Sequence, residues 1–167
     1  MFVLSLFIAG CNASGTPAGG VFFTGMPNPW IETDAATFAG EAGFAFAVPE
    51  NAEGIAYRLL KEAHLSETIF YMDGGKVTAR VQPSKKFDDI SGMYFSWTKE
   101  HESSILGFPG KERFANDGED FISSGIWYDK KTGRVFSFSH SCAKCDHAEE
   151  EKNLSKNAAA IFANAIK

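Results

Sequence analysis

The stretch SETIFYMDGGKVTARVQ (Ser66–Gln82) indicates the fold most clearly. β-Branched and aromatic residues on both arms are typical of strands. The Asp-Gly-Gly turn at Asp73–Gly75 is a strong signal for a tight hairpin. From Val77 to Val81 apolar and polar residues alternate, which places one face of this strand in a core and the other toward water. The sequence therefore predicts an antiparallel sheet that includes this hairpin.

A second hairpin is predicted by Phe121–Tyr128 and Arg134–His140, which flank a turn at Asp129–Gly133. Gly54–Leu65 is ambiguous, because its composition favours a helix while its apolar residues alternate as in a strand. Three further strands are expected: Phe44–Val48, Ile90–Thr98 with Met93, Phe95 and Trp97 on one face, and Ser103–Phe108 ending at a Pro109-Gly110 turn.

Helices are predicted at the two ends of this β-rich region. Thr33 or Asp34 can cap a short helix over Ala35–Ala42 that stops at Gly43. A longer helix should follow Asp146 and present one apolar face, formed by Leu154, Ala158, Ile161, Phe162 and Ala165. Sequential hairpins with helices at the ends predict an α+β fold, with a single antiparallel sheet and both helices packed on it.

Composition limits the domain count and the class of partner. The chain has 167 residues, of which 44% are hydrophobic, so one α+β domain over residues 26–167 is expected. A net charge of -5 disfavours nucleic acid as a partner. Sixteen Phe against four Tyr and three Trp must be buried or must line an apolar surface. They either fill the core or form a site for a small apolar ligand.

The first residues have the features of an exported lipoprotein. MFVLSLFIAG (1–10) has the length of the apolar centre of a signal peptide and is too short to span a bilayer. Ile8–Cys11 matches the lipobox, which predicts lipidation of Cys11. No Lys or Arg precedes the apolar run, so the signal peptide is expected to be truncated. Residues 11–25 then form a flexible linker that tethers the domain to the extracytoplasmic side of the cell membrane. The alternative is a buried N-terminal strand with a core cysteine.

Three short motifs follow one another along residues 26–167. They are Asn28-Pro29-Trp30, Asp89-Ile90-Ser91-Gly92-Met93-Tyr94 and Gly125-Ile126-Trp127. In this order they resemble a family of small uncharacterised bacterial lipoproteins. The resemblance implies an extracytoplasmic α+β domain and makes Gly54–Leu60 a strand. It supplies no catalytic residues.

The sharpest local signal for chemistry is H-x-C-x-x-C-x-H. A tetrahedral zinc site could be built from two thiolates and two imidazoles, those of His140, Cys142, Cys145 and His147. Four ligands within eight residues would strain the loop, so a site with three ligands, one of them a histidine, is easier to form. Cysteines just ahead of a helix are also typical of thiol–disulfide oxidoreductases, because the helix dipole stabilises a thiolate.

The third interpretation of these cysteines is structural. With Cys11 lipidated, Cys142 and Cys145 are the two thiols that remain, and an exported pair favours a disulfide. Inert free thiols are the alternative. The patterns G-x-S-x-G, H-E-x-x-H and the P-loop are absent from the sequence. We therefore expect a lipid-anchored module that binds a protein or a small apolar ligand rather than an enzyme, with zinc binding as the alternative and thiol–disulfide exchange a further one.

Overall fold

The structure, a computed structural model, describes residues 28–117 and 120–166. These residues form one sheet and two helices. The expected signal peptide, lipidated Cys11 and the linker over residues 11–25 all lie outside these residues. The strands are β1 (Ile31–Thr33), β2 (Glu53–Leu60), β3 (Leu65–Met72), β4 (Gly75–Pro83), β5 (Lys99–Ile105), β6 (Phe108–Asp117), β7 (Asp120–Asp129) and β8 (Arg134–Ala143). The helices are α1 (Ala35–Ala42) and α2 (His147–Ile161), with short 3-10 turns at Lys61–Ala63 and Ala163–Ile166.

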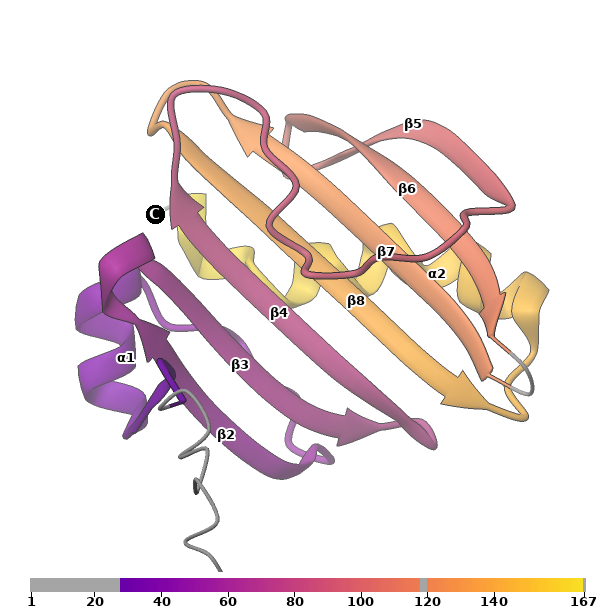
Figure 1. Cartoon of the computed structure of the whole chain (residues 1–167), viewed down its shortest axis with the longest axis horizontal. Coiled ribbons are helices and arrows are strands. Elements are labelled where there is room, and N and C mark those ends of the chain that lie inside the picture. Colours follow the sequence, from indigo (N-terminus) through magenta and orange to yellow (C-terminus); the bar gives the residue numbers. More distant parts are fainter. Residues whose placement is uncertain (1–27, 118–119, 167) are drawn as a thin grey trace, which may run out of the picture.

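All neighbouring strands of the sheet are antiparallel. Their order is β1-β2-β3-β4-β8-β7-β6-β5, so two meanders meet where β4 pairs with β8. The long helix α2 runs behind β8, β7 and β6 and also contacts β5, while α1 lies behind the β2–β3 end (Figure 1). The predicted α+β fold, with a single sheet, a short N-terminal helix and a longer C-terminal helix, is confirmed.

The predicted helix ends are confirmed as well. Asp34 caps α1 by accepting hydrogen bonds from the backbone N–H groups of Ala36 and Thr37, and Gly43 ends it with a φ of 79°. Asp146 caps α2 by accepting from Ala148 and Glu149. These polar side chains satisfy backbone donors that a helix start leaves free.

The sheet face toward the helices, here called the helix face, carries the main core. Phe136 stacks on Phe108 with ring centroids 5.3 Å apart and contacts Phe162 at 5.1 Å. Four of the five residues predicted for the apolar face of α2 are buried, and Ala165 is half-buried. The phenylalanines of the last strands are packed here too: Phe108, Phe114, Phe121, Phe136 and Phe138. Core filling therefore accounts for these side chains.

The predicted strand over Phe44–Val48 is not a strand in the structure. Phe44 and Phe46 point into the core and alternate with exposed Ala45 and Ala47, as the pattern indicated. The backbone, however, lies along the end of α2, where the N–H of Ala47 donates to the carbonyl of Ile161 at 2.9 Å. The alternation of apolar and small residues therefore indicated that one side of this segment is buried, and not that the segment pairs with a strand.

Ile90–Thr98 was also predicted as a strand and is not one in the structure. It belongs to the segment between β4 and β5, here called segment 84–98, which crosses the other face of the sheet over β8 and β7 (Figure 1). We call that face the loop face. Met93, Phe95 and Trp97 are half-buried and alternate with exposed residues, but the segment crosses the strands and does not pair along one.

Two further predictions are settled by the sheet register. The strand alternative holds for most of Gly54–Leu65, because β2 pairs with β3 and this tertiary contact overrides helix propensity. The Pro109-Gly110 turn is wrong, because both residues lie inside β6. The turn falls at Leu106–Gly107, where both residues have positive φ. Gly110 instead gives Trp127 room, since a Cβ there would overlap the indole.

Candidate functional site

The predicted H-x-C-x-x-C-x-H motif lies at the junction between β8 and α2. His140 and Cys142 are on β8 and project from the helix face, opposite Val77 and Gly75 of β4. Asp146 then starts the helix. The motif therefore lies between the sheet and the first turn of α2.

The two cysteines of the motif lie at disulfide-bonding distance. Their Cα atoms are 5.9 Å apart, within the range that a disulfide spans. Cys142 is 2% exposed, and Cys145 is half-buried. The bond ties the end of β8 to the residue that precedes the helix cap.

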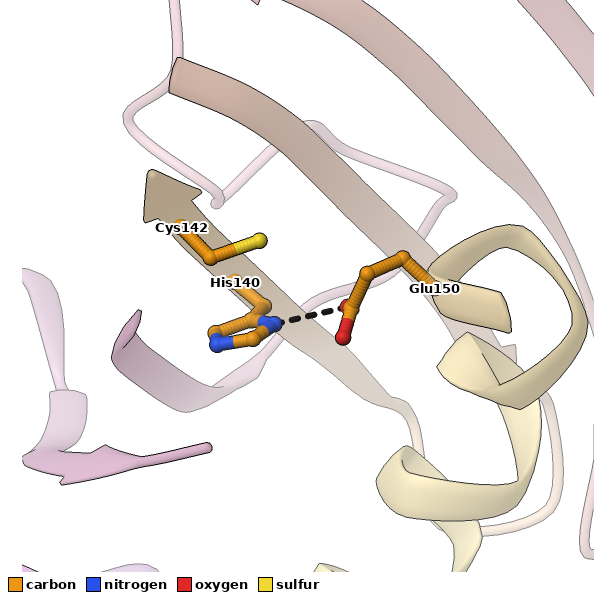
Figure 2. A group of neighbouring side chains, drawn as sticks. All are labelled: His140, Cys142 and Glu150. Atoms are coloured by element: carbon orange, nitrogen blue, oxygen red, sulfur yellow. Dashed lines mark hydrogen bonds and ion pairs between the residues drawn. The ribbon is translucent and has the colours of Figure 1, made fainter. Parts of the chain in front are cut away.

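His140 is buried and oriented by a carboxylate. Its Nδ1 lies 2.7 Å from an oxygen of Glu150, which comes from the first turns of α2 (Figure 2). Within the described residues its Nε2 makes no hydrogen bond. That nitrogen faces Gly75, where a Cβ would overlap it. An unpaired buried lone pair costs less free energy than an unpaired buried N–H group. The favoured neutral tautomer therefore carries its proton on Nδ1, donates it to Glu150, and keeps a lone pair on Nε2.

The structure does not assemble the four predicted metal ligands. His147 is exposed and stacks on Phe121, with ring centroids 4.3 Å apart. The possible ligand atoms that come together belong instead to His140, Cys142 and Glu150, and lie within 4.8 Å of one another. Sequence reasoning missed Glu150 as a partner of His140. Its spacing of one helical turn from Asp146 was the available signal.

The surroundings of the cysteines do not favour a reactive thiolate. The helix N-terminus that could stabilise one already donates to the carboxylate of Asp146, at 2.9 Å from Ala148 and 3.1 Å from Glu149. Glu149 and Glu150 add negative charge in the same turn. Because these carboxylates oppose a nearby thiolate and Cys142 is buried, the site fits a structural disulfide better than an oxidoreductase.

A second group of interacting residues lies on the loop face. Glu67 is fully buried and receives hydrogen bonds from Arg58 Nε at 2.8 Å and from Arg80 Nε at 2.6 Å. Both guanidinium groups also lie over the Trp30 ring, at 5.1 and 5.7 Å from its centroid. The positions of Arg58, Glu67 and Arg80 gave no sequence signal, because residues far apart in the chain meet only through strand register.

The three motifs behind the family resemblance converge here. Ile90 packs with Leu65, Ile126 and Val135, and Trp30 packs against the same cluster. Asn-Pro-Trp, Asp-Ile-Ser-Gly and Ile-Trp thus each contribute a side chain to one cluster on the loop face. The motifs fix segment 84–98 to the sheet.

Polar contacts reinforce this attachment. Arg80 donates to the carbonyl of Ile90 at 2.9 Å, and Arg113 donates to Asp89 at 2.8 Å. Ser91 donates to Asp89 at 2.6 Å. Burial raises the pKa of Asp89, but the hydrogen bonds from Ser91 and Arg113 outweigh it, so this pKa lies below its usual value. Trp97 receives the Arg113 guanidinium over its ring at 4.4 Å.

These attachments hold the backbone on both sides of an exposed aromatic side chain. Tyr94 follows the Asp89–Gly92 contacts and precedes Trp97, yet its side chain is 96% exposed. Phe87, in the same segment, is 40% exposed and borders a surface hollow of about 330 Å³ that Pro109 and Tyr128 also line. Segment 84–98 therefore presents two large aromatic side chains to solvent.

Comparison with known proteins adds no assignment. No protein-family model, curated protein or solved structure matches the chain. The resemblance to small bacterial lipoproteins stays a prediction. Among the helices that the structure describes, none has the length and apolar character needed to cross a bilayer.

Proposed function

We propose that this protein is a lipid-anchored, extracytoplasmic binding module that contacts a protein partner through segment 84–98. The observation that carries the proposal is Tyr94, almost fully exposed on a segment whose neighbouring residues are held to the sheet. Arg80 and Arg113, which are half-buried and buried, hold this segment through hydrogen bonds to Ile90 and Asp89. A connection of this length without secondary structure is usually functional.

Fixing the segment before binding favours affinity. A loop that is ordered only on binding loses conformational entropy at that moment, whereas a preorganised one does not. Tyr has few rotatable bonds and a ring with a polar tip, which is why it is enriched at binding hot spots. Phe87 and the adjacent hollow extend the surface, and the hollow could receive a partner side chain.

A protein partner suits this surface better than a small apolar ligand. The phenylalanines that could have lined an apolar site are packed in the core on the helix face. The loop face offers separate exposed aromatics with charged residues around them, such as Lys111 and Lys130. Exposed aromatic side chains with polar residues around them match the aromatic centre and polar rim of protein interfaces.

The lipid anchor at Cys11 belongs to the same proposal. It is supported by the lipobox and by the linker of small residues after it. Cys11→Ser should abolish incorporation of labelled fatty acid and move the protein from the membrane fraction to the soluble fraction. A variant that stays membrane-bound would refute the anchor without bearing on the loop face.

Site-specific photo-crosslinking tests the contact surface. A photoreactive phenylalanine analogue replaces Tyr94 in the full chain, expressed in the native cells. We expect a discrete crosslinked product that contains a second protein. The matched control carries the analogue at Tyr71, another exposed tyrosine on the loop face at 54% exposure, and should give no such product.

Two outcomes would overturn this proposal. One is the lack of a discrete product at position 94, and the other is the same product at position 71. A product that contains lipid and no protein would show that the segment touches the membrane surface instead.

A further inference from the structure

We propose that reduction of the Cys142–Cys145 disulfide turns the β8–α2 junction into a zinc site. Its ligands are the two cysteine thiolates, Nδ1 of His140 and the carboxylate of Glu150. This set differs from the sequence-based prediction, because Glu150 takes the place of His147. The proposal is independent of the contact surface on segment 84–98.

The donor atoms are already gathered around one point. Those of His140, Cys142 and Glu150 lie within 4.8 Å of one another. Figure 2 shows the Cys142 sulfur and the His140 Nδ1 on the side that faces Glu150. The Cys145 sulfur is bonded to that of Cys142 in the oxidised protein, so it starts beside the same point.

The adjustment needed to bind zinc is small. Bonds of about 2.0–2.3 Å place the ligands of a tetrahedral zinc ion about 3.4–3.8 Å apart. The 2.7 Å contact between His140 and Glu150 must open by about 0.7–1.1 Å, and a separation as long as 4.8 Å must close by about 1.0–1.4 Å. Side-chain rotation of the half-buried Glu150 can open its contact with His140. The sheet and α2 hold the backbone of the site.

The chemistry balances with a dithiol reductant. The reductant gives two electrons and two protons, the S–S bond breaks, two cysteine thiols form, and the reductant becomes a disulfide. Zinc then displaces the two thiol protons. The His140 proton moves from Nδ1 to Nε2, so that the Nδ1 lone pair is free for the metal. The new N–H on Nε2 has no acceptor within the described residues, and the metal–ligand bonds outweigh that cost. Two thiolates, one carboxylate and one neutral imidazole suit the preference of zinc for sulfur and nitrogen ligands.

Oxidation state therefore selects between two forms of the junction. In the disulfide the sulfurs carry no thiolate charge, so the oxidised protein lacks two of the four ligands. In the reduced protein the metal replaces the covalent link between β8 and α2. The metal and the disulfide exclude each other.

Metal titration of the full-length protein tests this inference. The protein is reduced with a phosphine under anaerobic conditions and titrated with Co²⁺, followed by Zn²⁺. We expect the visible bands of tetrahedral cobalt and the ultraviolet band of thiolate–cobalt charge transfer, saturating at one equivalent and lost when zinc displaces cobalt. The oxidised protein should show neither. Reduced protein without stoichiometric binding would overturn the proposal.

Two variants test the ligand set and avoid the buried histidine, whose loss can unfold the protein. Glu150→Gln should weaken zinc binding by about tenfold or more. His147→Ala is the matched control and should bind as the wild type does. Circular dichroism checks that both variants are folded. Unchanged binding in Glu150→Gln, or lost binding in folded His147→Ala, would refute this ligand set.

Discussion

Ile90 provides the sharpest test of how segment 84–98 is held. Its side chain is 8% exposed and packs against Leu65, Ile126 and Val135 on the loop face. Ile90→Ala removes three aliphatic carbons, worth about 0.8 kcal/mol each, or roughly 2.4 kcal/mol in transfer free energy. A residual cavity adds to this, and such substitutions cost about 2–5 kcal/mol. We expect a loss of about 3 kcal/mol.

Urea unfolding measures the free-energy change, and hydrogen exchange locates it. If the segment unfolds with the sheet, the full loss appears in global stability. If it detaches first, amides from Asp89 to Thr98 exchange faster while those of β4 and β8 keep their protection. Ile55→Ala is the matched control, because Ile55 is 44% exposed and should cost less than about 0.5 kcal/mol.

The refuting result is an Ile90→Ala protein with wild-type stability and wild-type exchange throughout the segment. It would mean that Ile90 does not anchor the segment. The anchoring of the backbone around Tyr94, on which the proposed function depends, would then lose its support.

Three further predictions concern single contacts. Gly92→Ala should destabilise the protein by about 1–2 kcal/mol in urea unfolding, because φ is 65° there and a Cβ would overlap the Arg80 guanidinium; an unchanged midpoint would contradict it. The double variant Cys142→Ser/Cys145→Ser should lose only about 2 kcal/mol of stability, since the closed loop is short; a loss above about 4 kcal/mol would show that the disulfide does more than close this loop. The pKa of Asp89 is lowered, so its ionised form stabilises the fold above the ordinary value of 3.8, and this stability is lost as pH falls through the lowered pKa. Tryptophan fluorescence against pH should therefore show a transition below pH 3.8 that Asp89→Asn lacks, and an identical acid transition in both proteins would count against this contact.

The parts of the fold that were predictable depend on local chemistry. The turn at Asp73–Gly74 has positive φ at both residues, which the Asp-Gly pair allows, and the helix caps depend on a single polar side chain each. The two extended segments were not predictable. Alternation in Phe44–Val48 and Ile90–Thr98 reports burial of one side, and the same burial arises against a helix end or across a sheet face.

The residues of the candidate sites were likewise predictable in part. The cysteine pair was visible because its two members are close in sequence. Whether His147 or Glu150 faces His140 depends on how α2 lies on the sheet, which the sequence does not state. The ion pairs of Glu67 likewise need the register between β2, β3 and β4. Sequence therefore indicated the elements, and strand register determined which side chains meet.

The most direct test of the proposed function is the affinity of the full-length protein for the partner crosslinked at position 94. Wild type, Tyr94→Ala and Tyr71→Ala are compared by titration calorimetry. We predict that Tyr94→Ala binds at least about 30-fold more weakly, which is the loss of a hot-spot residue worth about 2 kcal/mol, while Tyr71→Ala binds as the wild type does. Equal affinities for Tyr94→Ala and wild type would contradict the proposal.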